Sequence, residues 1–294
     1  MYFNKLATFV GIASLAVGSA FAANTQAGMP TPADFEKAFS FYYGDYEASP
    51  FSGKVSVFNW NSEEGIKRLE RSTFKGDFYR LAHHFKPQAF PSTCGIATAV
   101  NVVSAIYEIN EKDFPLILSV PIKIGDKTYG LDYKLFNEDN FLNETTDKII
   151  DRRAIKMQAR HNKTNQFSGG IDMEELKQVL ATYKIKSSVT QVKEFSDAAV
   201  GEFRTLLKNT LNSKDKFVIA NFNRAYQNIM VGGHFSPIVA FDEESDSIMI
   251  LDVAAHKNPW IWIGLSDFYH AMNSATYSGK DNRGYMVIDT KIGK

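Results

Sequence analysis

The sequence of 294 residues contains a single cysteine, Cys94, and no CxxC, HxxH or other cluster of cysteine and histidine. A lone cysteine cannot form a disulfide within its own chain, so small disulfide-rich folds are excluded. Structural zinc sites need several clustered Cys and His ligands, and none are spaced for that purpose here. We therefore expect a fold held by its apolar core, with no resident metal and no required cofactor.

The sequence also lacks an excess of either charge, since 33 basic residues balance 33 acidic ones. Proteins that collect nucleic acid or anionic membrane usually carry a strong positive field, so both are excluded as non-specific partners. Internal repeats and low-complexity linkers are missing as well. Aromatic residues make up 13% of the chain, a composition typical of a packed globule.

No apolar run reaches the ~20 residues that a membrane-spanning helix needs. The longest candidate near the start is residues 6–17, which follow Lys5 and precede the small-residue ending Ala20-Phe21-Ala22. This pattern predicts a signal peptide over 1–22 and export of a soluble bacterial protein to the periplasm or beyond, without stable membrane insertion. Residues 23–294 would then form one catalytic domain. A single cysteine in an exported chain is expected to be reactive or intermolecular.

Hydrophobic periodicity predicts an α+β fold in which helices come first and an antiparallel sheet follows. Residues 75–90 are expected to form a loop. Helices are predicted at 34–46, 62–71, 94–109, 145–157, 173–183 and 198–211, and strands at 55–60, 189–192, 217–222, 235–241, 247–252 and 284–289. The acidic turn 242–247 makes the strands on either side of it a hairpin.

Cys94 is the candidate nucleophile, because it follows the turn residues 91–93 and begins an apolar helical run. Unpaired N–H groups at a helix N-terminus favour a thiolate over a thiol. The amide of Gln88, six residues earlier, and the backbone N–H of Cys94 would together stabilise an oxyanion. The alternative is a buried structural cysteine, the common fate of a free thiol.

His234 and Asp252 are the candidate partners of that thiol. His234 begins a predicted strand after Gly232-Gly233, and Asp252 ends the next strand of the hairpin, so both lie at one end of the sheet. An imidazole suits proton transfer near neutral pH and needs an acceptor to fix its tautomer. Taken singly, each would more often be a structural residue. Arg224 either binds a substrate carboxylate through a bidentate pair or is a surface arginine.

Three segments resemble the catalytic segments of the phytochelatin synthase family: Gln88 with 91–95, Gly233-His-Phe-Ser-Pro-Ile238, and Ile250-Leu-Asp-Val-Ala254. Shorter similarities lie at 136–138, 221–224 and 283–288. The resemblance implies a papain-like cysteine peptidase fold acting on glutathione through a γ-glutamylcysteinyl thioester. It makes Cys94 the nucleophile, His234 the general acid/base, Asp252 its orienting partner and Gln88 the oxyanion donor. Arg224, Gly233 and Gly95 are the residues expected to line the substrate site.

Two differences from the plant members bear on the reaction. This sequence has no cysteine-rich C-terminal region, and Ala255 stands where the plant proteins have arginine. A missing cation there would weaken capture of a second, anionic glutathione, so we expect transfer to water to outrun phytochelatin synthesis. Cadmium or zinc would enter only as a thiolate complex of glutathione. A homodimer is possible.

Two other functions are compatible with these residues. One is an exported papain-like peptidase that cuts other peptides, since Gln, Cys, His and Asp are shared by such enzymes. The other is a non-catalytic protein that binds glutathione or a metal–thiolate complex in the same cleft.

Overall fold

The computed structural model describes residues 57–157, 169–224, 232–276 and 281–293. The chain divides into two compact units, Met1–Asp45 and Tyr46–Lys294, and all described residues belong to the second. The predicted signal peptide and the helix expected at 34–46 lie outside the described residues. In the described ranges, no helix has the length and apolar character needed to cross a membrane.

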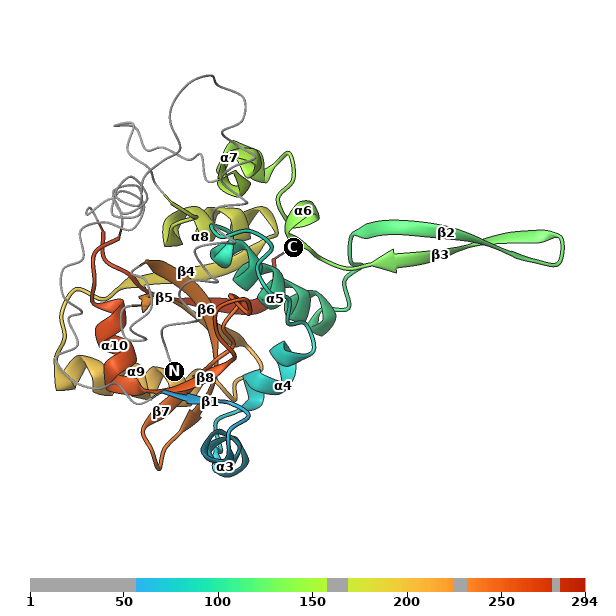
Figure 1. Cartoon of the computed structure of the whole chain (residues 1–294). Coiled ribbons are helices and arrows are strands. Elements are labelled where there is room, and N and C mark those ends of the chain that lie inside the picture. The colour runs from blue at the N-terminus through green and yellow to red at the C-terminus, as the bar shows by residue number, and fades with distance from the viewer. Residues whose placement is uncertain (1–56, 158–168, 225–231, 277–280, 294) are drawn as a thin grey trace, which may run out of the picture. The chain divides into compact units, whose positions relative to one another are not determined.

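The described part of the chain is built on a seven-stranded sheet whose neighbouring strands are all antiparallel, in the order β1-β8-β7-β6-β5-β9-β4 (Figure 1). The predicted hairpin is confirmed, because β6 pairs with β7 around the acidic turn. The strands are β1 (Val57–Asn59), β4 (Ile185–Gln191), β5 (Lys216–Asn223), β6 (Gly233–Asp242), β7 (Ser247–Ile250), β8 (Ile261–Gly264) and β9 (Gly284–Ile292).

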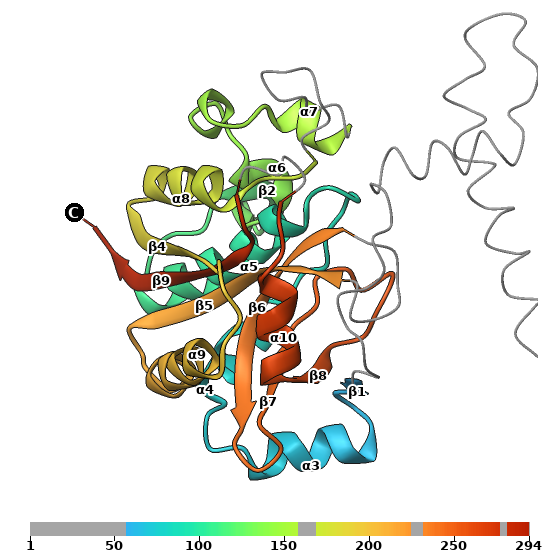
Figure 2. The same ribbon diagram turned by 90° about the vertical axis from the view of Figure 1, so that its left-hand side faces the viewer.

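Helices cover both faces of this sheet, and Figure 2 shows α9 and α10 on one side with α5 behind the strands. The predicted combination of helices with an antiparallel sheet is therefore confirmed. The helices are α3 (Glu63–Arg71), α4 (Gly76–Ala82), α5 (Cys94–Ile109), α6 (Glu138–Phe141), α7 (Arg152–Lys156), α8 (Met173–Thr182), α9 (Asp197–Thr210) and α10 (Leu265–Met272), with a 3₁₀ turn, η1 (Thr146–Lys148).

The interior strand β5 shows why the sheet has a hydrophobic core on each face. Phe217 and Ile219 belong to the core shared with α5 and α8, whereas Val218 and Phe222 belong to the core shared with α9 and α10. Successive side chains of a strand point to opposite faces, so an uninterrupted apolar strand needs cover on both. Helix α5 is equally enclosed, since every residue from 94 to 106 is buried. A helix apolar all round must be buried.

Helix starts follow the local sequence closely. The side chain of Ser62 accepts a hydrogen bond from the Gly65 N–H at 3.1 Å at the start of α3. Asp172 and Glu175 form a capping box that begins α8, with the Asp172 carboxylate accepting from the Glu175 N–H at 2.7 Å. Both caps satisfy backbone donors that have no partner within the helix, which explains why these two helices begin where the sequence predicts.

Two predictions of local structure are wrong. Residues 75–90 are not all loop, because α4 occupies 76–82 and buries Leu81 completely. The helix predicted over 145–157 is broken into η1 and α7. Asp151 ends the first piece by capping the second, since its side chain accepts from the N–H groups of Arg153 and Ala154, both at 2.8 Å. A capping carboxylate inside a polar segment competes with continuous helix.

An additional two-stranded ribbon, β2 (Leu116–Ile124) and β3 (Lys127–Lys134), was not predicted. It forms its own antiparallel sheet, separate from the seven-stranded one, and every residue in both strands is exposed. Figure 1 shows it extending away from the sheet and helices of the same unit.

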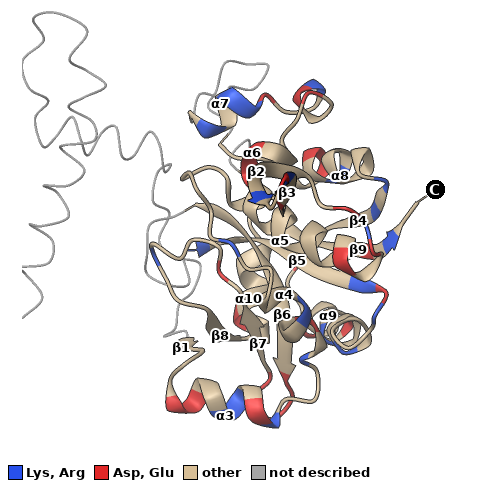
Figure 3. Ribbon diagram, turned by 90° about the vertical axis from the view of Figure 1, so that its right-hand side faces the viewer, with Lys and Arg blue, Asp and Glu red and all other residues tan. Residues whose placement is uncertain are grey.

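Charged residues of both signs alternate along α3, as the ribbon in Figure 3 shows. Glu63 and Lys67 lie one turn apart there and form an ion pair at 2.7 Å. Such exposed pairs contribute little to stability, and the mixture leaves no single-sign field on this helix.

Candidate active site

Cys94 is the first residue of α5, as the sequence predicts, and only 8% of it is exposed. The loop before it is held from two directions. The Asn101 side chain of α5 accepts from the Lys86 N–H at 2.8 Å and donates to the Lys86 carbonyl at 3.2 Å. The Gln88 N–H donates to the carbonyl of Val253 at 2.8 Å. This loop therefore connects the start of α5 to Val253, the residue next to Asp252.

Helix α5 approaches β6 closely at the site because Gly95 has no side chain. A Cβ at Gly95 would lie 2.4 Å from Cγ2 of Ile171 and 3.2 Å from Cδ2 of Phe235. Phe235 is the neighbour of His234 on β6, so this contact sets the separation between the thiol and the imidazole. The structure thus gives Gly95 a packing role; its expected contact with substrate stays a prediction.

His234 and Asp252 lie side by side and are almost completely buried. The His234 Nε2 and the Asp252 Oδ1 are 2.8 Å apart. Since Nε2 faces the carboxylate, Nδ1 is the ring nitrogen that remains for the Cys94 thiol, which is hydrogen-bonded to His234. The order thiol, imidazole, carboxylate is the one that nucleophilic catalysis requires.

Asp252 has two further partners that fix its position. The Ala254 N–H donates to Asp252 Oδ1 at 2.8 Å, and the guanidinium of Arg224 forms an ion pair with Oδ2. Both ends of this pair are buried. The prediction that Asp252 ends a strand is wrong: β7 ends at Ile250, and Asp252 lies two residues beyond it, where the chain is free to turn toward His234.

The three groups shift one another's pKa values. Burial raises the pKa of the Cys94 thiol, but the hydrogen bond and the charge of His234 outweigh it, so the net shift is downward. Burial lowers the pKa of His234, yet the Asp252 carboxylate reverses this and raises it. Burial also opposes the ionised form of Asp252, whereas His234 and Arg224 bring its pKa down to about 2. These directions favour a thiolate–imidazolium pair beside a permanent carboxylate.

Arg224 is not the surface arginine that one interpretation predicted, since it is 4% exposed. One nitrogen of its guanidinium pairs with Asp252, while Nε and Nη1 are buried and have no hydrogen-bond partner among the described residues. The expected bidentate hydrogen bonding of Arg224 to a substrate carboxylate stays a prediction. Nε and Nη1 are the two donors that could make it. Gly233 is exposed, and a Cβ there would lie 3.1 Å from the Nε of Arg283.

The Gln88 side chain lies in the loop before Cys94, with its amide turned toward the loop itself. Its Nε2 donates to the carbonyls of Phe90 at 2.8 Å and Pro91 at 3.2 Å, and its Oε1 is buried without a partner in the described part of the chain. The predicted oxyanion donor is therefore placed in the right loop, but its N–H groups are occupied by the backbone.

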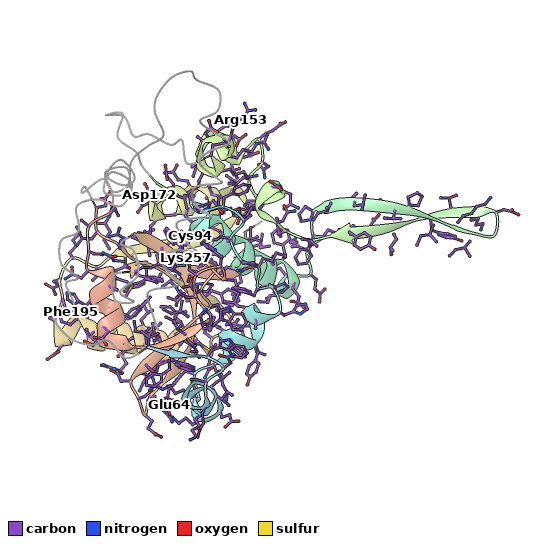
Figure 4. The ribbon with its side chains drawn as sticks, in the orientation of Figure 1. Glu64, Cys94, Arg153, Asp172, Phe195 and Lys257 are labelled. Atoms are coloured by element: carbon purple, nitrogen blue, oxygen red, sulfur yellow. The ribbon has the colours of Figure 1, made fainter. Side chains whose placement is uncertain are left out.

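Three residues near the site were not predicted. The buried Glu138 accepts from the Ala89 N–H at 2.8 Å and so supports the Gln88 loop, and burial raises its pKa. Asn101, which holds the Lys86 backbone, differs from its neighbours in the sequence only as a polar amide within an apolar helical run. Lys257 lies beside Cys94 in Figure 4. Burial and the charge of Arg224 lower its pKa, while the nearby Cys94 and Asp252 act in the opposite direction.

Among the described residues, no group of three or more His, Cys, Asp or Glu side chains could hold a metal ion. The side chains of the site supply a buried thiol, an imidazole whose tautomer is fixed by a carboxylate, and two cations, Arg224 and Lys257.

The sequence model of the phytochelatin synthase family matches residues 54–285, which include the whole site. The chain belongs to the phytochelatin synthase family. It is 26% identical over 223 residues to glutathione gamma-glutamylcysteinyltransferase 3 of Lotus japonicus, covering 76% of this chain and 39% of that protein. It is 24% identical over 220 residues to glutathione gamma-glutamylcysteinyltransferase 1 of Arabidopsis thaliana, covering 75% and 38%.

A shorter match, 28% identical over 120 residues, joins the chain to glutathione gamma-glutamylcysteinyltransferase of Schizosaccharomyces pombe, with 41% of this chain and 28% of that protein covered. The chain thus spans about two fifths of the length of the plant relatives.

Proposed function

We propose that this chain is a papain-like cysteine enzyme that cleaves the Cys–Gly bond of glutathione through a γ-glutamylcysteinyl thioester. The observation that carries the proposal is the continuous line from Cys94 through His234 to Asp252 at the junction of α5 and β6. Family membership supports glutathione as the substrate, because the relatives are named for γ-glutamylcysteinyl transfer.

In the acylation step, the Cys94 thiolate attacks the carbonyl carbon of the cysteinyl residue of glutathione, and a tetrahedral oxyanion forms. The Cys94 N–H at the start of α5 would donate to this oxyanion, since N–H groups of a first turn have no acceptor within the helix. The Gln88 amide would join it only by releasing the Phe90 and Pro91 carbonyls. His234 then protonates the glycine nitrogen, the C–N bond breaks, and glycine leaves.

In the deacylation step, His234 accepts a proton from the attacking nucleophile while the bond from the acyl carbon to Cys94 Sγ breaks. Water as nucleophile yields γ-glutamylcysteine; the amine of a second glutathione yields a phytochelatin with two γ-glutamylcysteine units. Asp252 holds His234 in position through both steps. With Ala255 in place of a cation, we expect water to be the faster acceptor.

Two cations suit the charge of this substrate. Glutathione carries a carboxylate at the glycine end and another at the γ-glutamyl end. The charges of Cys94 and Asp252 both act on Lys257, so its ammonium group is near enough to the site to attract the glycine carboxylate during acylation. The unpaired Nη1 of Arg224 is a second donor near the same carboxylate–imidazole pair.

Mass spectrometry of millimolar glutathione incubated with the purified protein tests the proposal, with Cys94→Ala as the control that lacks the nucleophile. Release of glycine and γ-glutamylcysteine by the wild type alone is the expected result. Addition of cadmium or zinc tests whether metal–glutathione thiolates are better substrates; the metal is treated as part of the substrate. Glutathione left intact by the wild type, with and without metal, would overturn the proposal.

A panel of unrelated peptides distinguishes the peptidase alternative, and thiol labelling distinguishes the binding alternative. A peptidase would cut the panel faster than glutathione. A protein that only binds would leave every substrate intact, and its Cys94 would react slowly with iodoacetamide at mildly acidic pH, because a protonated thiol is a poor nucleophile.

A further inference from the structure

The ribbon formed by β2 and β3 divides cleanly into two faces. The register pairs Leu118 with Tyr133, Val120 with Leu131, and Ile122 with Tyr129. Paired residues of an antiparallel ladder point to the same side of the sheet. The other side carries the pairs Ser119–Asp132, Pro121–Gly130 and Lys123–Thr128. One face is therefore almost entirely apolar and the other is polar.

Within the part of the chain that the structure describes, nothing covers the apolar face. Seven of its side chains are large and exposed by 36–65%: Leu118, Val120, Ile122, Ile124, Tyr129, Leu131 and Tyr133. Figure 4 shows side chains projecting from both sides of this ribbon. An isolated two-stranded hairpin is marginally stable in water, and a contiguous apolar patch of this kind marks an interaction site.

We propose that this face packs against the same face of a second copy of the chain, forming a small two-layer sandwich across a two-fold axis. Half-exposed aromatic and branched side chains in this number remove on the order of 600 Å² per copy from water, near the ~800 Å² per partner of a standard interface. A two-fold interface also needs a surface that fits itself, and an apolar ladder facing its own copy provides like side chains on both sides.

The bulk of the unit decides the direction of packing. Two faces packed together lie only about 10 Å apart. If both ribbons pointed the same way, the two sheet-and-helix bodies at their bases would occupy the same space. The ribbons must therefore run in opposite directions, with the tip of one over the base of the other. This places Ile124 over the second copy's Leu118, and Lys127 over its Tyr133, where a cation can lie on the ring.

The charge of the ribbon argues against an anionic membrane as the occupant. Residues 111–134 contain four lysines and four acidic residues, so no polybasic cluster accompanies the apolar face. Pairing along an edge is also disfavoured on β2, because Pro121 at its middle has no N–H to donate. The apolar face, rather than the edges, is the part that needs a partner.

Analytical ultracentrifugation of the full chain between about 1 and 100 μM tests the proposal over the range of ordinary dimer affinities. The variant is Leu131→Asp at the centre of the apolar face, and the matched control is Thr128→Asp, the same charge on the same strand but on the polar face. We expect the wild type and Thr128→Asp to form dimers, and Leu131→Asp to weaken dimerisation at least tenfold.

The ribbon is exposed along its length, so these variants should leave circular dichroism and glycine release unchanged. A wild type that stays monomeric at every concentration would overturn the proposal. So would a dimer that Leu131→Asp leaves intact, or one that both variants weaken equally. A monomer that binds neutral or anionic vesicles, with Leu131→Asp abolishing the binding, would assign the face to lipid instead.

Discussion

The His234 Nε2 lies 2.8 Å from the Asp252 Oδ1, and the Asp252 Oδ2 is held by the guanidinium of Arg224. The carboxylate therefore connects the imidazole to a buried cation. Such an arrangement fixes the tautomer in which Nε2 carries the proton and Nδ1 faces the thiol.

Asp252→Asn should reduce kcat for glycine release by about 10²–10⁴-fold, because a neutral amide neither stabilises the imidazolium nor enforces its tautomer. Steady-state kinetics measure the loss. Asp246→Asn is the matched control: Asp246 pairs with Arg204 at 2.7 Å in the turn at the far end of the same hairpin. An Asp252→Asn variant as active as this control would remove Asp252 from the mechanism.

The pH dependence should follow the shifted pKa values of Cys94 and His234. The thiol pKa is lowered and the imidazole pKa is raised. The thiolate–imidazolium ion pair therefore exists at pH values between these two pKa values. Activity should rise as pH increases through the pKa of Cys94 and fall as pH passes above that of His234. A bell-shaped profile of kcat/KM is the expected measurement.

His234→Gln should raise the pKa of the Cys94 thiol, which His234 lowers in the wild type. Without the imidazolium, burial raises the pKa of Cys94 and is opposed by the Phe235 backbone and the charge of Arg224, so the pKa should be higher than in the wild type. The rate of alkylation by iodoacetamide, measured against pH, should show its midpoint shifted upward. An unchanged midpoint would mean that the helix terminus, not His234, controls the thiolate.

Lys257→Ala should raise KM for glutathione about tenfold while leaving kcat within about twofold, since a lost carboxylate contact weakens binding more than chemistry. Lys257→Arg, which keeps the charge, should restore most of the affinity. Lys208→Ala, which removes the exposed partner of Glu243, is the control for loss of one positive charge. An effect confined to kcat would speak against a binding role for Lys257.

Gly95→Ala should destabilise the protein by about 1–3 kcal/mol and slow acylation, because the added methyl overlaps Ile171 and forces α5 away from β6. Thermal unfolding and glycine release measure the two effects. Gly201→Ala in α9 is the matched control: the nearest atom to its Cβ would be 4.0 Å away. There the helix should gain stability, since alanine is the better helix former.

The exposed ribbon shows what sequence reasoning could have found and did not. Residues 118–124 and 127–133 alternate between apolar and polar side chains, and Gly125, with φ of 62°, supplies the turn between them. Alternation around a glycine turn is a recognised hairpin signal. Pro121, in the middle of the first run, weakens that signal, because proline is disfavoured inside a strand.

Some features were beyond the sequence for a physical reason. Lys257 is an ordinary charged residue by local pattern, and Glu138 stood out only through the short similarity at 136–138. Both matter because chain segments distant in sequence lie beside the Cys94 helix. Arg224 is a similar case, since only the pairing of β5 with β6 brings it to Asp252. Periodicity reports which face of an element is buried, but not which element covers it.

The sequence alone determined the start of the cysteine helix, the hairpin that carries His234 and Asp252, and the kinship with phytochelatin synthases, because caps, periodicity and contiguous motifs are local. Only the tertiary structure decided that Gln88 donates to its own loop and that Asp252 is shared between His234 and Arg224. Hydrogen bonds between distant segments depend on how helices and sheet pack, and packing is a property of the whole fold.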